Sequence, residues 1–191
     1  MGHLKNLPQL RIKTPSLELR RLAPADAHKI FLMSQEEGMR TWLPSQVYDN
    51  ESHAASIVGF LISQYSEPAD PKRGPYVLGV SLTYTGELIG HVGLSPIMES
   101  VEIGFAIERA YQGMGFAAEA VRAFCEWGLG QSSIDSILGV TSARNIASKK
   151  TLVRAGFGKQ KDALMKFQGK EQAVEVFRFT RLLSVPARSE A

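Results

Sequence analysis

The spacing of hydrophobic residues near the start of the chain predicts a strand followed by a helix. Apolar and charged residues alternate over residues 17–22, which is the pattern of a strand with one buried face. Pro24 suits the first turn of a helix, so we expect a helix over residues 24–35. Residues 39–49 contain Trp-Leu-Pro and are predicted to form a loop.

The next segment predicts a second helix and then a hairpin. Asn50 or Ser52 is suited to cap a helix that runs to about residue 65, because both side chains can accept a backbone N–H bond. Residues 66–75 hold three prolines and a glycine and predict a loop. Residues 76–84 and 88–94 then predict two strands joined around a Thr-Gly turn.

The second half of the chain alternates predicted strands and helices. The remaining elements are expected at the following residues: strands at 101–107, 134–140, 157–161 and 173–180, and helices at 113–129 and 145–156. Apolar residues recur at helical spacing in the longer helix, namely Ala117, Ala120, Val121 and Phe124. Gly156 is expected to end the shorter helix, and the tail after residue 183 is polar.

Composition narrows the classes of protein to consider. The chain has 191 residues, 44% of them hydrophobic, which suits one globular domain. The net charge of +3 comes from dispersed residues, which argues against nucleic-acid binding. Cys125 is the only cysteine, so it excludes an internal disulfide and is expected to be a small buried side chain. No signal peptide or membrane span is apparent, so we expect a cytoplasmic protein that does not bind membranes.

A glycine-rich turn lies between the strand expected at 101–107 and the helix that follows it. Residues 111–120 read Tyr-Gln-Gly-Met-Gly-Phe-Ala-Ala-Glu-Ala. A turn of this kind before a helix presents unpaired N–H groups, and the helix start adds a partial positive charge. Gly113 and Gly115 can adopt positive φ and let a ligand approach the backbone. Together these features predict a site for a phosphate or pyrophosphate.

Two short motifs follow each other in this half of the chain. The first is Gln112-x-x-Gly115-x-Ala117, and the second is N-x-x-S-x-x-x-L-x-x-x-G-F over residues 145–157. Both resemble signatures of the GNAT N-acetyltransferase superfamily, in that order. The closest resemblance is to the branch with the ribosomal-protein N-terminal (RimJ/RimL-like) acetyltransferases. It covers about residues 14–182 and does not specify an acceptor.

The resemblance implies an α/β architecture, the GNAT fold. This fold has a single mixed, mostly antiparallel and twisted sheet, with helices on both faces and a splayed central strand pair. It would form one acetyltransferase domain over residues 1–191, with a core of about 14–182 and a polar tail after 183.

The resemblance also implies that acetyl-coenzyme A is the cosubstrate and that no metal takes part. The turn would hold the pyrophosphate, and the pantetheine arm would pair with the strand at 101–107 like an extra strand. One main-chain N–H there would polarise the acetyl carbonyl. The implied cofactor-binding residues are Phe105, Ala106, Ile107, Gln112, Gly113, Met114, Gly115, Phe116, Ala117, Asn145 and Ser148. Gly104 is typical of a bulge in that strand. Two alternatives to the cofactor-binding roles are that the strand at 101–107 is purely structural and that Asn145 only caps its helix.

Two residues are candidates for proton transfer. Ser148 would lie near the thioester sulfur and could donate a proton to the leaving thiolate. Glu102, a carboxylate within the strand at 101–107, is the first candidate for the general base. Glu99 is a weaker candidate, and His91 could also serve, although a structural role suits it better.

These residues together indicate an N-acetyltransferase that moves an acetyl group from acetyl-coenzyme A to a primary amine. The amine would attack directly in a ternary complex. A protein N-terminus, a polyamine and a drug-like amine all fit as acceptor, and the family also allows a homodimer. The alternative is a GNAT-fold protein that binds coenzyme A without catalysis.

Overall fold

The computed structural model describes residues 10–65, 69–130 and 134–180, and the statements below concern those residues. Its strands are β1 (Arg11–Lys13), β2 (Leu17–Arg21), β3 (Tyr76–Leu82), β4 (Leu88–Ile97), β5 (Ser100–Ile107), β6 (Ser136–Ser142), β7 (Gly158–Phe167) and β8 (Lys170–Thr180). Its α-helices are α1 (Ala27–Ser34), α2 (Glu37–Trp42), α3 (Glu51–Ser63), α4 (Phe116–Gly130) and α5 (Ile146–Ala155). Three short 3₁₀ turns are η1 (Pro24–Asp26), η2 (Pro44–Gln46) and η3 (Arg109–Tyr111).

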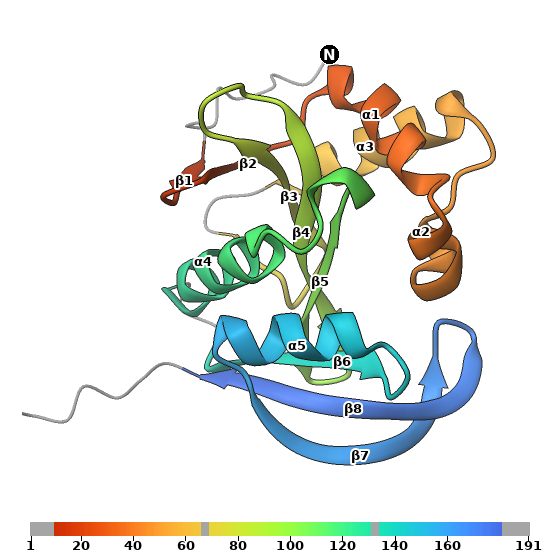
Figure 1. Cartoon of the computed structure of the whole chain (residues 1–191), viewed down its shortest axis with the longest axis vertical. Helices are drawn as coiled ribbons and strands as arrows, with labels where there is room; N and C mark the ends of the chain where they lie inside the picture. Colours follow the sequence, from red (N-terminus) through yellow and green to blue (C-terminus); the bar gives the residue numbers. More distant parts are fainter. Residues whose placement is uncertain (1–9, 66–68, 131–133, 181–191) are drawn as a thin grey trace, which may run out of the picture.

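The described strands form one sheet in the order β1-β2-β3-β4-β5-β6-β8-β7 (Figure 1). Every neighbouring pair is antiparallel except β5 and β6, which run parallel. The crossover between those two parallel strands contains α4, as parallel pairing requires. This architecture confirms the predicted α/β fold with a mixed, mostly antiparallel sheet.

Helices cover both faces of this sheet. On one face, α4 and α5 pack over the main core, in which Phe124 and Leu152 are fully buried or nearly so. On the other face, α1 and α3 pack over β3 and β4 through a smaller cluster that includes Ile30, Val58 and Leu88, with Val77 of β3 packed against it. Burying each such side chain contributes about 2 kcal/mol, so both clusters fix the central strands in place.

Most predicted elements are present, with three corrections in length. The segment predicted as a loop at 39–49 contains the end of α2 and the turn η2. The helix predicted from residue 113 begins at Phe116, because Gly113 and Gly115 have φ values of +80° and +91°. The last two strands are longer than predicted and form the β7–β8 hairpin.

Other predictions can be compared in detail. Asn50, not Ser52, caps α3 by accepting a bond from the His53 N–H. Gly156 ends α5 in the left-handed conformation, as predicted. The bulge expected at Gly104 is wrong, because β5 pairs with β4 along its whole length without a register shift. Strand β1 was not predicted, and the tail after 183 and part of the 66–75 loop lie outside the described residues.

Candidate active site

The two parallel strands at the centre of the sheet separate after a short contact. β5 pairs with β4 along its full length, but it pairs with β6 only at Val101 and Glu102. From Ile103 to Ile107 the edge of β5 that faces β6 therefore has no strand partner among the described residues. Figure 1 shows β6 turning away from β5 at this point. The predicted splayed strand pair is present.

The alternation of hydrogen-bonded and non-bonded residue pairs between β4 and β5 shows which main-chain groups of β5 face the open edge. Glu108 N–H donates to the Ile89 carbonyl at 2.8 Å, which makes this a bonded antiparallel pair. Bonded and non-bonded pairs alternate along such a ladder. The main-chain groups of Phe105 and Ile107 therefore point away from β4 and toward the gap, whereas those of Ala106 point toward β4.

The turn after β5 presents free donors at the end of this open edge. The first bond of α4 runs from the Glu119 N–H to the Gly115 carbonyl at 3.1 Å. The N–H groups of residues 113–118 have no acceptor in the part of the chain that the structure describes. A Cβ built on Gly113 or Gly115 would meet no atom within 4 Å, so the space above this turn is open to a ligand.

Gln112 joins the turn to the strand. Its side-chain amide donates to the Ile107 carbonyl at 2.8 Å, which is the last main-chain oxygen of the open edge. This side chain therefore holds the turn against the strand. The backbone N–H of Gln112 donates to the Arg109 carbonyl at 3.2 Å, so it is not one of the free donors of the turn. Met114, at the tip of the turn, is 62% exposed.

The start of α5 places the second pair of predicted residues. The Asn145 side-chain oxygen accepts a bond from the Ser148 N–H at 3.0 Å, so the cap role considered for Asn145 is present. The Ser148 hydroxyl has no hydrogen-bond partner among the described residues. Next to it, Lys149 donates to the Ala143 carbonyl at 2.8 Å and to Glu175 at 2.7 Å. These two bonds anchor the first turn of α5 and hence the position of Ser148.

Glu102 lies where β5 and β6 part. It is half-buried, and burial raises the pKa of its carboxyl above the usual value. This is the direction that a general base for an amine requires. Ala106 lies four positions further along the strand, or about 13 Å away. Glu102 therefore lies on the same face as Ala106 but reaches its neighbourhood only through water.

His91 lies closer to Ala106 than Glu102 does. The two residues are directly paired across β4 and β5, and burial lowers the pKa of His91 to about 4. The imidazole is therefore neutral at pH 7. Its Nε2 is 2.9 Å from Oε1 of Gln46 in η2. Because that oxygen can only accept, Nε2 carries the proton and Nδ1 has a free lone pair.

The contact between Gln46 and His91 was not predictable from the sequence. Residue 46 falls in a segment predicted to be an irregular loop, and no sequence motif surrounds Gln46.

Within the described residues no group of His, Cys, Asp and Glu could hold a metal ion, and no helix is long and apolar enough to cross a bilayer. Cys125 is fully buried, as predicted, and burial raises the pKa of its thiol well above the usual value.

Comparisons with known proteins agree with this geometry. A family model described as an acetyltransferase (GNAT) domain matches residues 16–158. The uncharacterized N-acetyltransferase YoaA of Bacillus subtilis (strain 168) is 26% identical over 152 residues, which cover 78% of this chain and 83% of YoaA.

Two solved structures share the fold at low sequence identity. The ribosomal alpha-N-protein acetyltransferase RimL in complex with coenzyme A has a TM-score of 0.74 at 15% identity, covering 90% of this chain and 98% of that one. The microcin C7 self-immunity acetyltransferase MccE in complex with acetyl-CoA and AMP has a TM-score of 0.71 at 16% identity, covering 87% of this chain and 93% of that one.

Proposed function

The chain belongs to the GNAT acetyltransferase family, and from this premise we propose that it transfers the acetyl group of acetyl-CoA to a primary amine. The enzyme is an acetyl-CoA-dependent acetyltransferase. The amine acceptor and its direct attack in a ternary complex are the proposed part.

One observation carries the proposal: the open edge of β5 runs directly into residues 113–118, the turn and the start of α4, whose six N–H groups have no acceptor among the described residues. The edge supplies main-chain partners for the two amides of a pantetheine arm. The turn supplies donors and a helix start for a pyrophosphate. In this proposal the main-chain groups of Phe105 and Ile107 hold the arm, whereas Ala106 between them contributes no free main-chain group because its own point toward β4. Residues 112–117 hold the pyrophosphate.

The reaction then needs little more than positioning. The amine nitrogen attacks the acetyl carbonyl carbon, a C–N bond forms, and the C–S bond breaks. A main-chain N–H at Phe105 or Ile107 stabilises the oxygen on which charge develops. The amine proton leaves through water toward Glu102, and Ser148 donates its hydroxyl proton or a hydrogen bond to the departing thiolate. Asn145 contacts the arm through its remaining amide donors.

The acceptor is a protein N-terminus or a small-molecule amine. The fold shared with RimL supports the first, because that protein is an alpha-N-protein acetyltransferase. The fold shared with the immunity acetyltransferase MccE, solved in complex with acetyl-CoA and AMP, supports acetyl-CoA as the donor and does not discriminate between the two acceptors. We further propose that the protein is one domain, works in the cytoplasm without nucleic-acid or membrane partners, and is compatible with a homodimer.

Initial-rate kinetics test the proposal. Peptides with free N-termini, polyamines and aminoglycosides are each offered with acetyl-CoA, and released thiol is measured. We expect turnover with at least one class and intersecting double-reciprocal lines, as a ternary complex requires. Parallel lines would indicate a covalent intermediate instead. Tight coenzyme A binding without turnover of any amine would favour the non-catalytic alternative.

Ser148→Ala tests the proposed acid. We expect turnover to fall at least about tenfold with little change in acetyl-CoA affinity, since the hydroxyl acts on the leaving group. The cap bond from the Ser148 N–H to Asn145 remains in this variant, so the melting temperature should stay near that of the parent. A normal rate per folded enzyme would exclude the role of Ser148.

Glu102→Gln tests the proposed base. We expect a reduced rate at neutral pH and loss of the ascending limb of the pH profile, because that limb reports deprotonation of a carboxyl whose pKa is raised. At high pH, where more of the amine is already neutral, the variant should partly recover. If the variant keeps the parent's rate and pH profile, the proton leaves by another route, for which His91 is the nearest candidate.

A further inference from the structure

The segment that leads from β5 into the glycine turn is held by side chains from α1 and from the turn between β3 and β4. Lys29 of α1 forms an ion pair with Glu108, with 2.7 Å between Nζ and Oε2. Its ammonium also donates to Oε1 of Glu87 at 3.3 Å. The hydroxyl of Tyr111, in η3, donates to the other carboxylate oxygen of Glu87 at 2.8 Å. These four side chains form one connected group, the Lys29 network.

A further contact from the same part of the chain holds the backbone of this segment. Glu36, which lies between α1 and α2, accepts the Arg109 N–H with both carboxylate oxygens, each at 3.1 Å. The N–H of Glu108 is bonded to the Ile89 carbonyl at 2.8 Å. Residues 108, 109 and 111 are therefore all tied to other elements of the fold.

The glycine turn itself has no comparable attachment. The N–H groups of residues 113–118 have no acceptor in the part of the chain that the structure describes. A Cβ built on Gly113 or Gly115 would meet no atom within 4 Å. The position of the turn relative to the edge of β5 is therefore set by the segments on either side of it. On the side of β5, that segment is the one held by the Lys29 network.

This position matters for a ligand that contacts both surfaces at once. In the proposed binding mode the pantetheine arm lies along β5 and the pyrophosphate lies on the turn. Both groups of one molecule are engaged only when the turn keeps its distance and direction from the strand edge, because misplacement by a fraction of an ångström weakens contacts that depend on geometry. A turn that is held in place before binding also spares the ligand the entropic cost of ordering it.

Lys29 is suited to hold this segment because its ion pair with Glu108 is partly shielded from water. The Lys29 side chain is 27% exposed and that of Glu108 is 22% exposed. Such a pair is screened less than one on the open surface. Among the described residues, neither Glu87 nor Glu108 has another cationic partner. Loss of the ammonium would therefore release both carboxylates, and Tyr111 would then be bonded to an unanchored Glu87.

We propose that Lys29 is a positioning residue for the cofactor: through its network it holds the glycine turn at the spacing from β5 that coenzyme A requires. Lys29 itself does not touch the cofactor and takes no part in acetyl transfer. This inference rests on the proposed function, because it takes residues 113–118 as the pyrophosphate site.

Calorimetry with coenzyme A tests this role without requiring turnover. We expect Lys29→Met to weaken binding about tenfold, and Lys29→Arg, which keeps the charge and the donors, to retain most of the affinity. Tyr111→Phe removes one bond of the network without changing any charge, so it should weaken binding about threefold. In initial-rate measurements, the KM for acetyl-CoA should rise in both weakened variants, whereas kcat at saturation should stay near that of the parent.

Lys159 supplies the matched control, because it also pairs with two carboxylates but lies in β7. Its Nζ is 2.8 Å from Oδ1 of Asp162 and 3.1 Å from Oε2 of Glu175. Lys159→Met removes the same charge as Lys29→Met and should keep the parent's affinity for coenzyme A.

Parental affinity in both Lys29→Met and Tyr111→Phe would overturn the positioning role. Equal weakening by Lys29→Met and Lys159→Met would also overturn it, because the effect would then come from net charge alone. The expected pattern of coenzyme A binding, without acetylation of any amine, would overturn the proposed function and leave the role of Lys29 standing.

Discussion

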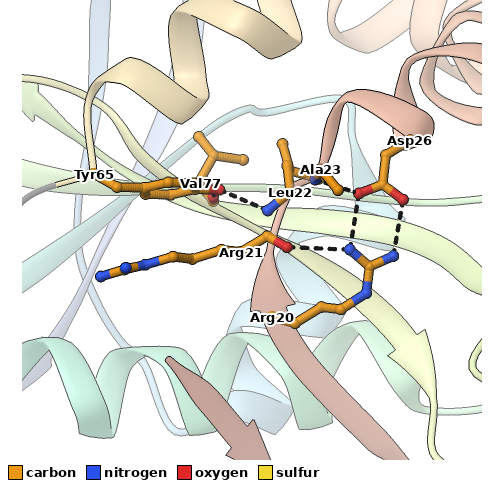
Figure 2. Close-up of polar contacts among 7 residues, drawn as sticks. All are labelled: Arg20, Arg21, Leu22, Ala23, Asp26, Tyr65 and Val77. Carbon is orange, nitrogen blue, oxygen red and sulfur yellow. Dashed lines mark hydrogen bonds and ion pairs between the residues drawn. The ribbon is translucent and has the colours of Figure 1, made fainter. Parts of the chain in front are cut away.

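Two junctions between a strand and a helix use their backbone donors in opposite ways. At the end of β2, the backbone N–H groups of Leu22 and Ala23 each donate to a side chain (Figure 2). Leu22 N–H donates to the Tyr65 hydroxyl and Ala23 N–H to Asp26, both at 2.8 Å. Asp26 also accepts two 2.8 Å bonds from the Arg20 guanidinium. At the end of β5, the N–H groups of residues 113–118 have no such partner among the described residues.

The difference lies in the residue types at each junction. The first junction has a buried carboxylate and a half-buried tyrosine, and burial raises the pKa of Tyr65 to about 12, so its hydroxyl stays protonated. The second junction has two glycines at positive φ with open space around them. Unpaired donors are costly when buried, but they are available for binding when they are open to solvent. One junction therefore holds the fold together, and the other holds a ligand.

The largest expected effect is on the first junction. Asp26→Ala leaves the Arg20 guanidinium and the Ala23 N–H without their acceptor in a partly buried site. We expect the free energy of unfolding to fall by about 3 kcal/mol. Acetyl-CoA affinity, measured by calorimetry on the folded protein, should not change. A variant with normal stability and weakened binding would contradict the division between the two junctions.

Acid should weaken the same junction. Burial alone would raise the pKa of Asp26, but bonds from Arg20 and the Ala23 N–H lower it below its ordinary value of 3.8. Its contribution is therefore fully present above pH 3.8 and is lost as pH falls through the lower folded pKa. The stability difference between parent and Asp26→Ala should shrink over that range in denaturant titrations.

At the second junction, unlike the first, a substitution should weaken acetyl-CoA binding. Gly115→Val places a branched side chain at φ +91° in the space where phosphates would approach. We expect acetyl-CoA to bind at least about tenfold more weakly, or 1.4 kcal/mol. Gly86→Val is the matched control, because Gly86 has φ +74° and equally open surroundings in the β3–β4 turn. Both variants should lose similar stability, and only Gly115→Val should lose affinity.

The sequence predicted the second junction better than the first. Glycines with fixed spacing before a helix point to a phosphate turn, because few other residues fit positive φ. The Asn145 cap and the Gly156 helix end were predictable for the same reason, since each depends on local conformation. These features need only neighbouring residues to be recognised.

Contacts between distant segments were not predictable. Tyr65 meets Leu22 across 43 residues, and Ser45 meets Gln168 across 123. Neither pair has a local pattern, because the sheet order alone brings the segments together. The open edge of β5 has the same origin: residues 103–107 look like any strand, and only the divergence of β6 leaves them unpaired. The resemblance to a family, not the hydrophobic pattern, anticipated that divergence.

The smallest expected effect on stability comes from removing the Tyr65 hydroxyl while its aromatic ring is kept. Tyr65→Phe removes the group that accepts from Leu22 N–H and donates to the Val77 carbonyl at 2.6 Å. The ring, over which the Arg21 guanidinium lies at 5.2 Å, is retained. Two backbone groups lose their partner, so we expect a stability loss of about 1 kcal/mol in urea titrations. Acetyl-CoA affinity should remain that of the parent, because the second junction does not contact Tyr65. Weaker acetyl-CoA binding in this variant would show that the two junctions are coupled through the sheet, and the contrast between them would then be one of degree.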